Sequence, residues 1–240
     1  MYRNRTYRNL VRPDRLVSFR VTVDETDLLI HASSQLEETA KKSILKHRGY
    51  IEGFIKQHPE FLTALHPLKI KEPSPAIIRD MADAGAKAGV GPMAAVAGAI
   101  AENVGLDLLA GSEEIIVENG GDIFIKTNQP ITVGIFAGDS PLSMRIGMRI
   151  KNRAEPAAVC TSSGTIGHSL SLGKTDAVSV FADSCFLADA AATSIGNRID
   201  SVNDIKSGIE FGKTINGIRG LIIIIKDKTG IWGDLEIVKI

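Results

Sequence analysis

The grouping of strand-like segments most constrains what this chain can fold into. Segments with strand-like apolar patterns come in hairpin-like runs, at residues 16–32 and 114–125, and residues 131–136 and 142–150 extend the second run. Blocks of helical pattern separate these runs, whereas a doubly wound parallel sheet needs regular alternation of strand and helix. We therefore expect an α+β fold with mostly antiparallel sheets packed against helices.

The helical blocks divide into several predicted helices, which differ in how much of their surface is expected to be buried. A first helix is predicted from Ser34, with Ser33 or Ser34 as its N-cap and an apolar face that includes Leu45. Alanine-rich helices are predicted at residues 93–109 and 184–196, the first of them buried, with a shorter helix near 203–211. Further strands are expected at 157–160, 176–182, 220–226 and 235–240.

Length and charge narrow the class of protein. A chain of 240 residues with a formal net charge of +0 can form one domain, which we place at residues 1–240. Balanced charge removes the general attraction to nucleic acid, which we do not expect as a partner. Five arginines crowd residues 1–15; we interpret this stretch as a basic, solvated tail, with phosphate binding as the alternative.

Compartment signals are sparse. The most apolar late run, residues 221–225, is far shorter than the roughly 20 residues that cross a bilayer, so no membrane partner is expected. Two cysteines, Cys160 and Cys185, lack metal-type or disulfide-framework spacing, which agrees with a reducing compartment. With no export signal recognised, a cytoplasmic location is predicted.

Two glycine-rich segments follow predicted strands. In Asn119-Gly120-Gly121-Asp122, the glycines can turn backbone N–H groups toward an anion, although hairpins also use Asn-Gly for turning alone. The loop from Thr161 to Ser169 gathers hydroxyls, glycines and one imidazole, and can wrap a phosphate. It lacks the Walker lysine, so a polar surface loop stays the alternative.

Two helical segments carry the remaining candidates. Asp189 and Thr193 are four residues apart and share one helix face, a carboxylate and a hydroxyl that suit magnesium better than zinc. The alternative interpretation is that Asp189 is simply solvated and that the Thr193 hydroxyl bonds to a carbonyl of its own helix. The small residues of Ala97-Gly98-Ala99-Ile100-Ala101 permit close approach of a backbone or flat ring, although for this segment alone ordinary helix packing is the favoured explanation.

Taken in chain order, these segments resemble the motifs of ApbE-type FAD:protein FMN transferases over roughly residues 90–197. The matching stretches are Gly98-Ala99-Ile100-Ala101, Gly120-Gly121-Asp122, Thr161-Ser162-Ser163-Gly164, His168, and Ala188-Asp189-Ala190-Ala191-Ala192-Thr193. The resemblance is to an archaeal-type branch without an assigned activity. It implies an ApbE-like, T-fold-related domain.

The resemblance also implies an activity and a set of roles. ApbE-type transferases move FMN from FAD to a threonine or serine of an acceptor protein, with magnesium. Asp189 and Thr193 would then bind Mg²⁺ together with the Ala99 carbonyl, and His168 and Asp189 would be the catalytic residues. The pocket for FAD or FMN would be lined by Gly120, Gly121, Asp122, Thr161, Ser162, Ser163, Gly164 and His168.

Two departures from the transferase pattern bear on activity. Glu102-Asn103 stands where the transferases usually carry Lys-Gly, so a carboxylate replaces a cation expected beside phosphate. The His-x-x-Asp-Pro-x-Thr-Gly run is also absent, because Ser169-Leu170-Ser171-Leu172-Gly173-Lys174 follows His168. The ligand could therefore differ from FAD.

Three hypotheses remain. The first is a magnesium-dependent flavin or nucleotide pyrophosphate enzyme, with Asp189 essential. The second is a non-catalytic flavin- or nucleotide-binding accessory protein linked to sulfur (sulfide) assimilation, in which Cys160 would matter more than Cys185. The third, ranked last, is an oligomeric interaction protein without a small-molecule site, and homo-oligomers are left open in all three.

Overall fold

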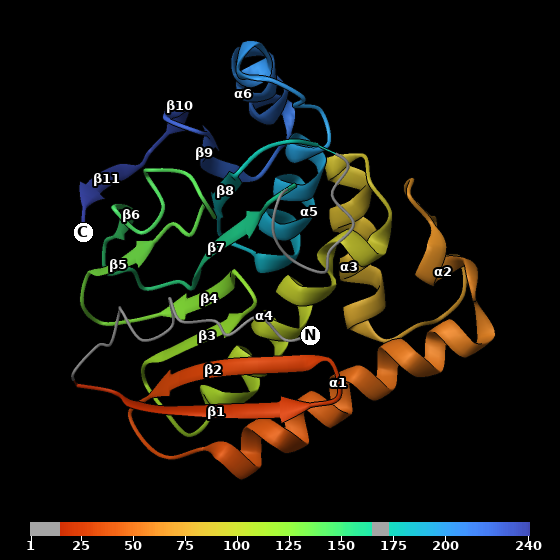
Figure 1. Cartoon of the computed structure of the whole chain (residues 1–240). Helices are drawn as coiled ribbons and strands as arrows, with labels where there is room; N and C mark the ends of the chain where they lie inside the picture. Colours follow the sequence, from red (N-terminus) through yellow and green to blue (C-terminus); the bar gives the residue numbers. More distant parts are fainter. Residues whose placement is uncertain (1–14, 165–172) are drawn as a thin grey trace.

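An eight-stranded antiparallel sheet forms the centre of the computed structural model, which describes residues 15–164 and 173–240 (Figure 1). Its strand order is β1-β2-β3-β4-β7-β8-β9-β10. The strands are β1 (Val17–Val23), β2 (Thr26–Ala32), β3 (Ile115–Asn119), β4 (Asp122–Lys126), β7 (Ala157–Ser162), β8 (Ala177–Ala182), β9 (Ile218–Ile225) and β10 (Lys228–Gly233). The expected α+β class and antiparallel pairing are confirmed.

A second, three-stranded sheet corrects one expectation. Residues 131–136 and 142–150 were expected to extend the main sheet, but β5 (Ile131–Gly134) and β6 (Ile146–Ile150) pair with β11 (Glu236–Lys239) in the order β11-β6-β5. Their inward side chains form a separate core with one face of the large sheet, which includes Val133, Met148, Ile222 and Ile224. Burial of that sheet face decides the pairing, and local pattern does not reveal it.

The helices pack on the opposite face of the large sheet, where they form the larger core (Figure 1). They are α1 (Glu37–Gln57), α2 (Glu60–Thr63), α3 (Ala76–Ala88), η2 (Pro92–Ala95), α4 (Val96–Leu108), α5 (Cys185–Gly196), η3 (Val202–Asp204) and α6 (Ile205–Thr214). Eleven of the twelve residues of α5 are buried, and α4 packs against α5, β3 and β4. These two inner helices carry the predicted metal ligands Ala99, Asp189 and Thr193.

Two local predictions were wrong, and one strand was missed. Helix α1 begins at Glu37 with Leu36 as N-cap, because Ser34 Oγ instead donates to the Gly111 carbonyl. Leu45 is 52% exposed, since it lies about 100° around the helix from the buried Ile44. Strand β10 was not predicted; it is a largely exposed edge strand with two glycines, so its sequence lacks the apolar run of an inner strand.

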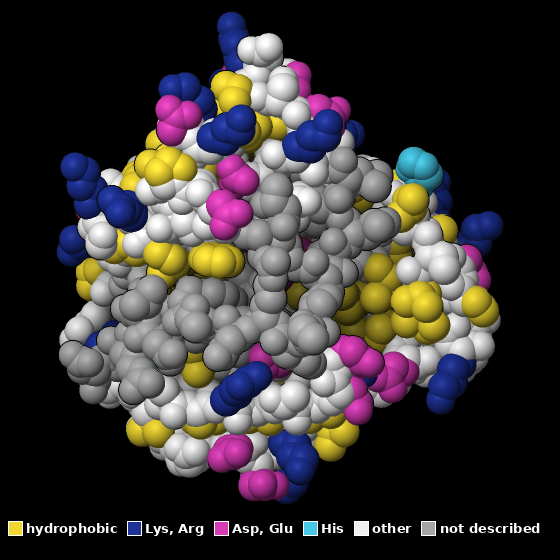
Figure 2. Space-filling model, viewed as in Figure 1, with side chains coloured by type: hydrophobic (Ala, Val, Ile, Leu, Met, Phe, Trp, Pro, Cys, Tyr) yellow, Lys and Arg dark blue, Asp and Glu magenta, His cyan; other side chains and the backbone are white. Residues whose placement is uncertain are grey.

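Charged groups of both signs are mixed over the face of the molecule shown in Figure 2, as the balanced composition leads one to expect. The basic stretch 1–15 lies outside the described residues, except for Arg15, which pairs with Glu114. No single helix within residues 15–164 and 173–240 has the length and hydropathy of a membrane span; only α3 and the η2–α4 segment taken together do, and they are bent by 103°.

Candidate functional site

The first part of the site is the start of α4, where Asp189 of α5 reaches the backbone. The Asp189 carboxylate oxygen Oδ2 accepts a hydrogen bond from the Gly98 N–H at 2.9 Å, and the Ala97 N–H also contributes. These N–H groups lie in the first turn of α4, where a helix has no internal acceptors for them. An acidic side chain is stabilised there by the hydrogen bonds and by the helix dipole.

Gly98 is what lets α5 come this close. A Cβ atom at position 98 would lie 2.3 Å from the Cys185 carbonyl oxygen and 2.9 Å from the Asp189 Cβ, well inside contact distance. The predicted close approach at this small residue is therefore real, and the approaching group is the main chain of α5. Its consequence is that Asp189 reaches α4 directly.

Asp122 brings the β3–β4 hairpin to the same place. Gly120 and Gly121 make the turn with φ of 68° and 121°, and Asp122 follows with only 7% of its surface exposed. The Asn119 side chain donates from Nδ2 to the Ala97 carbonyl at 3.0 Å, which ties the hairpin to α4. The turn is thus a positional device, and Asp122 lies within electrostatic reach of Asp189.

Both carboxyl groups have raised pKa values. Burial raises the pKa of Asp122 well above its usual range, and the charge of Asp189 raises it further. Burial also raises the pKa of Asp189, to about 7, although the Gly98 and Ala97 N–H groups oppose this. Within residues 15–164 and 173–240, no ion pair involves either carboxylate. Asp122 is buried and Asp189 is half-buried, and like charges with so little solvent and no counter-charge are unfavourable. This pair would therefore be stabilised by a cation.

Strand β7 supplies hydroxyl groups to the same region. Thr161 donates its N–H to the Gly121 carbonyl at 3.2 Å, and its Oγ1 lies 2.7 Å from Ser179 Oγ on β8. Ser162 is buried, and the Gly164 N–H bonds to the Thr175 carbonyl. Ser179 was missed by sequence reasoning; the signal for it is a hydroxyl inside the apolar run 177–182, where it is fully buried.

Three further predicted residues are placed differently from one another. Thr193 lies one turn beyond Asp189 on α5 and is 9% exposed. The Ala99 carbonyl already accepts a hydrogen bond from the Asn103 Nδ2 at 2.9 Å, so a cation would share or displace that donor. His168 lies outside the described residues. The structure therefore brings together Gly121, Asp122, Thr161 and Asp189, while Ser163 and Gly164 follow β7 directly before residues 165–172, which lie outside the described part of the chain.

Glu102 has a role that sequence reasoning missed. Its Oε2 accepts from the Cys185 N–H at 2.6 Å and from Ser184 Oγ at 3.1 Å, at the start of α5. Burial raises the pKa of this carboxyl group, while these hydrogen bonds lower it. The glutamate that stands here in place of lysine therefore puts a carboxylate at the N-terminus of α5. The sequence signal for this role was an acidic residue one helical turn after Gly98.

Cys160 is not a reactive thiol in this structure. It is fully buried in β7, and its Sγ lies 3.6 Å from the Cys185 carbonyl oxygen. Burial raises the pKa of the Cys160 thiol well above its usual range, which disfavours the nucleophilic thiolate. Its environment fits a structural cysteine.

The donors present fit magnesium. Asp189, Asp122 and Thr193 offer oxygen atoms only, and Mg²⁺ prefers a few protein oxygens completed by water and phosphate. In the described part of the chain, no group of three or more His, Cys, Asp or Glu side chains could hold a metal by itself. A cation here would therefore depend on water or a ligand for part of its coordination.

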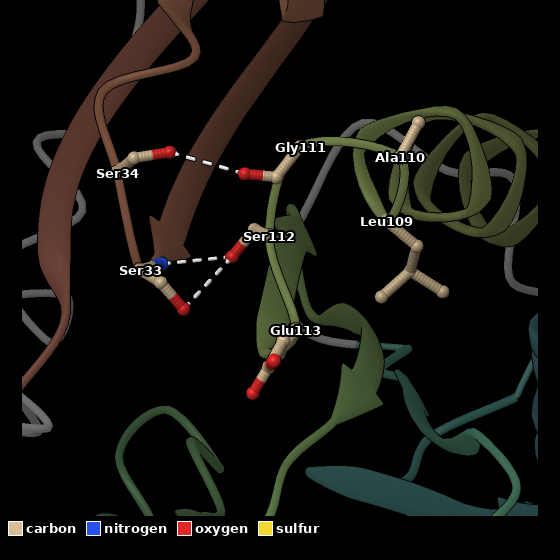
Figure 3. A pocket seen from close by; sticks show the side chains of 7 residues that line it. All are labelled: Ser33, Ser34, Leu109, Ala110, Gly111, Ser112 and Glu113. Carbon is tan, nitrogen blue, oxygen red and sulfur yellow. Dashed lines mark hydrogen bonds between the residues drawn. The ribbon is translucent and has the colours of Figure 1, made fainter.

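A surface hollow of about 440 Å³ lies elsewhere, between the end of β2 and the end of α4 (Figure 3). Its hydroxyl groups bond within its own wall: the Ser33 N–H donates to Ser112 Oγ at 2.8 Å, and Ser34 Oγ donates to the Gly111 carbonyl at 3.2 Å. Because these groups are already satisfied, we interpret this hollow as a structural junction.

Solved structures share this fold. The apo flavinyl transferase ApbE of Pseudomonas stutzeri superposes with a TM-score of 0.56 at 14% identity, covering 91% of this chain and 94% of that one. The flavin transferase ApbE of Vibrio cholerae gives 0.58 at 13%, with 91% and 96% covered. At such low sequence identity the likeness concerns the fold alone. The fold is that of the ApbE-like α+β proteins.

The chain belongs to the family whose model is described as AbpE bacteria, which matches residues 8–215. A UPF0280 protein of Methanocaldococcus jannaschii is 41% identical over 227 residues, covering 92% of each chain. A UPF0280 protein of Methanocella arvoryzae is 41% identical over 214 residues, covering 89% of this chain and 87% of that one. The predicted kinship with an ApbE-like branch is confirmed.

Proposed function

We propose that the chain binds Mg²⁺ together with FAD where α4, β4, β7 and α5 meet, and transfers FMN to a threonine or serine of an acceptor protein. The observation that carries the proposal is the Asp122–Asp189 pair, two poorly solvated carboxylates with no ion-pair partner in the described part of the chain. The ligand class comes from the fold relatives, which are named flavin transferases.

In this proposal the main role of the protein is to hold the two carboxylates in position for the cation. The Gly98 N–H holds Asp189 Oδ2, and the Gly120-Gly121 turn holds Asp122 beside it. Bound magnesium would neutralise the pyrophosphate and the leaving phosphate, as in phosphoryl-type transfer generally. The acceptor oxygen would bond to the FMN phosphorus while the bond to AMP breaks. The hydroxyl proton would pass to a base, and His168, predicted as a catalytic residue, is our candidate for it.

A second candidate, a non-catalytic flavin-binding accessory protein, is favoured by Glu102. This carboxylate lies at the start of α5, where a lysine would have offered positive charge. The sulfur-linked version loses its support from Cys160, because that thiol is buried with a raised pKa. Binding of FAD without release of AMP would favour this candidate.

Calorimetric titration with FAD, FMN and ADP, with and without Mg²⁺, tests the proposal. The unaltered chain should bind FAD only with Mg²⁺, and Asp189→Asn, of almost the same shape, should lose this binding. Asp107→Asn is the matched control, since Asp107 is an acid of α4 that bonds to α1 instead. Equal FAD binding with and without Mg²⁺, or by Asp189→Asn, would refute the metal-dependent site.

Transfer is tested separately from binding. The chain is mixed with FAD, Mg²⁺ and a candidate acceptor protein, and AMP release is measured beside the acceptor's mass. The transferase predicts a gain of one FMN less one water on the acceptor, with one AMP for each modification. FAD binding without either product would leave the accessory protein as the better description.

A further inference from the structure

Helices α4 and α5 are joined by two carboxylates at places one helical turn apart. Asp189 of α5 accepts from the Gly98 N–H (2.9 Å), and Glu102 of α4 accepts from the Cys185 N–H (2.6 Å). Gly98 and Glu102 are four residues apart on α4, and Cys185 and Asp189 are four apart on α5. Each pair therefore lies on one face of its helix, and the two faces meet.

Each helix supplies the acid that caps the other. The N-cap residues of α4 and α5, Ala95 and Ser184, make no side-chain capping bond of their own. First-turn N–H groups lack acceptors within their helix and are costly to bury unpaired. Asp189 accepts from the Ala97 and Gly98 N–H groups of α4, and Glu102 accepts from the Cys185 and Phe186 N–H groups of α5. The two caps are reciprocal, so they share one geometry.

The reciprocal caps depend on how closely the helices approach. Gly98 leaves room for the Cys185 carbonyl, which would lie 2.3 Å from a Cβ at that position. Cys185 is the same residue whose N–H Glu102 holds. A shift of the first turn of α5 would therefore move Cys185 away from both Gly98 and Glu102. The same rigid turn leads directly to Asp189.

We propose that Glu102 is a positioning residue for the cation site. By holding the first turn of α5 against α4, it determines where Asp189 meets the α4 amides and presents its carboxylate beside Asp122. Glu102 also occupies the N-terminus of α5, so a ligand phosphate would not be bound there. The ligand's identity rests on the proposed function, whereas the placing of Asp189 does not.

Amide hydrogen exchange in the metal-free protein tests the placing of Asp189. Glu102→Ala should lower the protection of the Gly98 N–H, which Glu102 does not touch, by about tenfold, the loss of one hydrogen bond to a charged group. Glu102→Gln keeps an acceptor oxygen and should restore most of the protection. Unchanged protection of Gly98 in Glu102→Ala would overturn the proposal.

Mn²⁺ affinity, followed by electron paramagnetic resonance, tests the consequence for the cation. Glu102→Ala should weaken Mn²⁺ binding by about tenfold or more, as for other groups that hold a metal ligand in place, and Glu102→Gln by much less. Asp107→Ala is the control: it removes another α4 carboxylate, one that contacts Ser43 and His47 of α1, and should lower the melting temperature without changing Mn²⁺ affinity.

The two measurements separate the inference from the proposed function. Equal Mn²⁺ affinity in the unaltered chain and Glu102→Ala would overturn the positioning role. An unaltered chain that binds no Mn²⁺ would instead refute the metal-dependent function, and the exchange of the Gly98 amide would still decide whether Glu102 places Asp189.

Discussion

At the scale of single residues, the site depends on a missing side chain as much as on those present. Gly98 has no Cβ, so the Cys185 carbonyl and the Asp189 side chain can both lie against the α4 backbone. The hydrogen bond from the Gly98 N–H to Asp189 Oδ2 requires this approach. Position 98 is thus as important to the site as the carboxylates themselves.

Gly98→Ala should therefore be far more harmful than its size suggests. The new methyl group would meet backbone and Cβ atoms that cannot rotate away, which should cost about 1–3 kcal/mol of the free energy of unfolding, as overpacked sites do. Metal-dependent ligand binding should be lost as well. Chemical denaturation measures the first effect and calorimetry the second.

Gly53→Ala is the matched control. Gly53 lies within α1, and a Cβ there would have open space within 4 Å. This change should stabilise the protein by about 0.5–1 kcal/mol, because alanine is the better helix former. If the two substitutions had the same effect, close packing at Gly98 would not be the reason for its glycine.

At the scale of elements, a second junction fixes the outer helix α1 to α4. Asp107 Oδ2 accepts from Ser43 Oγ (2.7 Å) and Lys46 Nζ (2.8 Å), and it lies 3.0 Å from His47 Nε2. His47 is 6% exposed, and its Nδ1 has no hydrogen-bond partner among the described residues. Burial lowers the pKa of His47 below its ordinary 6.5, although Asp107 opposes the shift. The neutral imidazole is therefore the form that fits this junction.

Stability should consequently fall in mild acid. Because the pKa of His47 is lower in the folded state, the unfolded chain binds more protons near pH 6. The contribution of neutral His47 to folded-state stability is therefore complete above pH 6.5 and declines below it. Urea denaturation at pH 7.5 and 5.5 measures this loss. His47→Gln keeps a donor for Asp107 but does not titrate, so it should lose less stability over that interval. Equal losses in both chains would contradict the assignment.

At the scale of the whole molecule, one large sheet separates two cores. The helices cover one face, and β5, β6 and β11 cover part of the other. Strand β11 lies far in sequence from β5 and β6, and the inner side chains of the small sheet pack on the large sheet, so the small sheet needs the large sheet as a surface. This arrangement predicts that the chain unfolds as one domain, although its cores are distinct.

Two methionines test that prediction, because each is fully buried in a different core. Met81→Ala opens a cavity on the helical side and Met148→Ala on the side of the small sheet. Each should cost about 2–5 kcal/mol, and both should lower the midpoint of a single transition. Far-ultraviolet circular dichroism and Trp232 fluorescence should change together. A separate early transition in Met148→Ala would divide the chain into two units.

The sequence by itself determined the α+β class, most strands and the buried helices α4 and α5, because apolar period and glycine turns are local properties. Through motif resemblance it also proposed Gly121, Asp122 and Asp189 as candidate site residues, a role that stays a prediction. The roles of Glu102, Asn119 and Ser179 came only from the tertiary structure, since each depends on a partner from another element. The separate sheet did too, because a strand pattern specifies which residues are buried but leaves open which surface buries them.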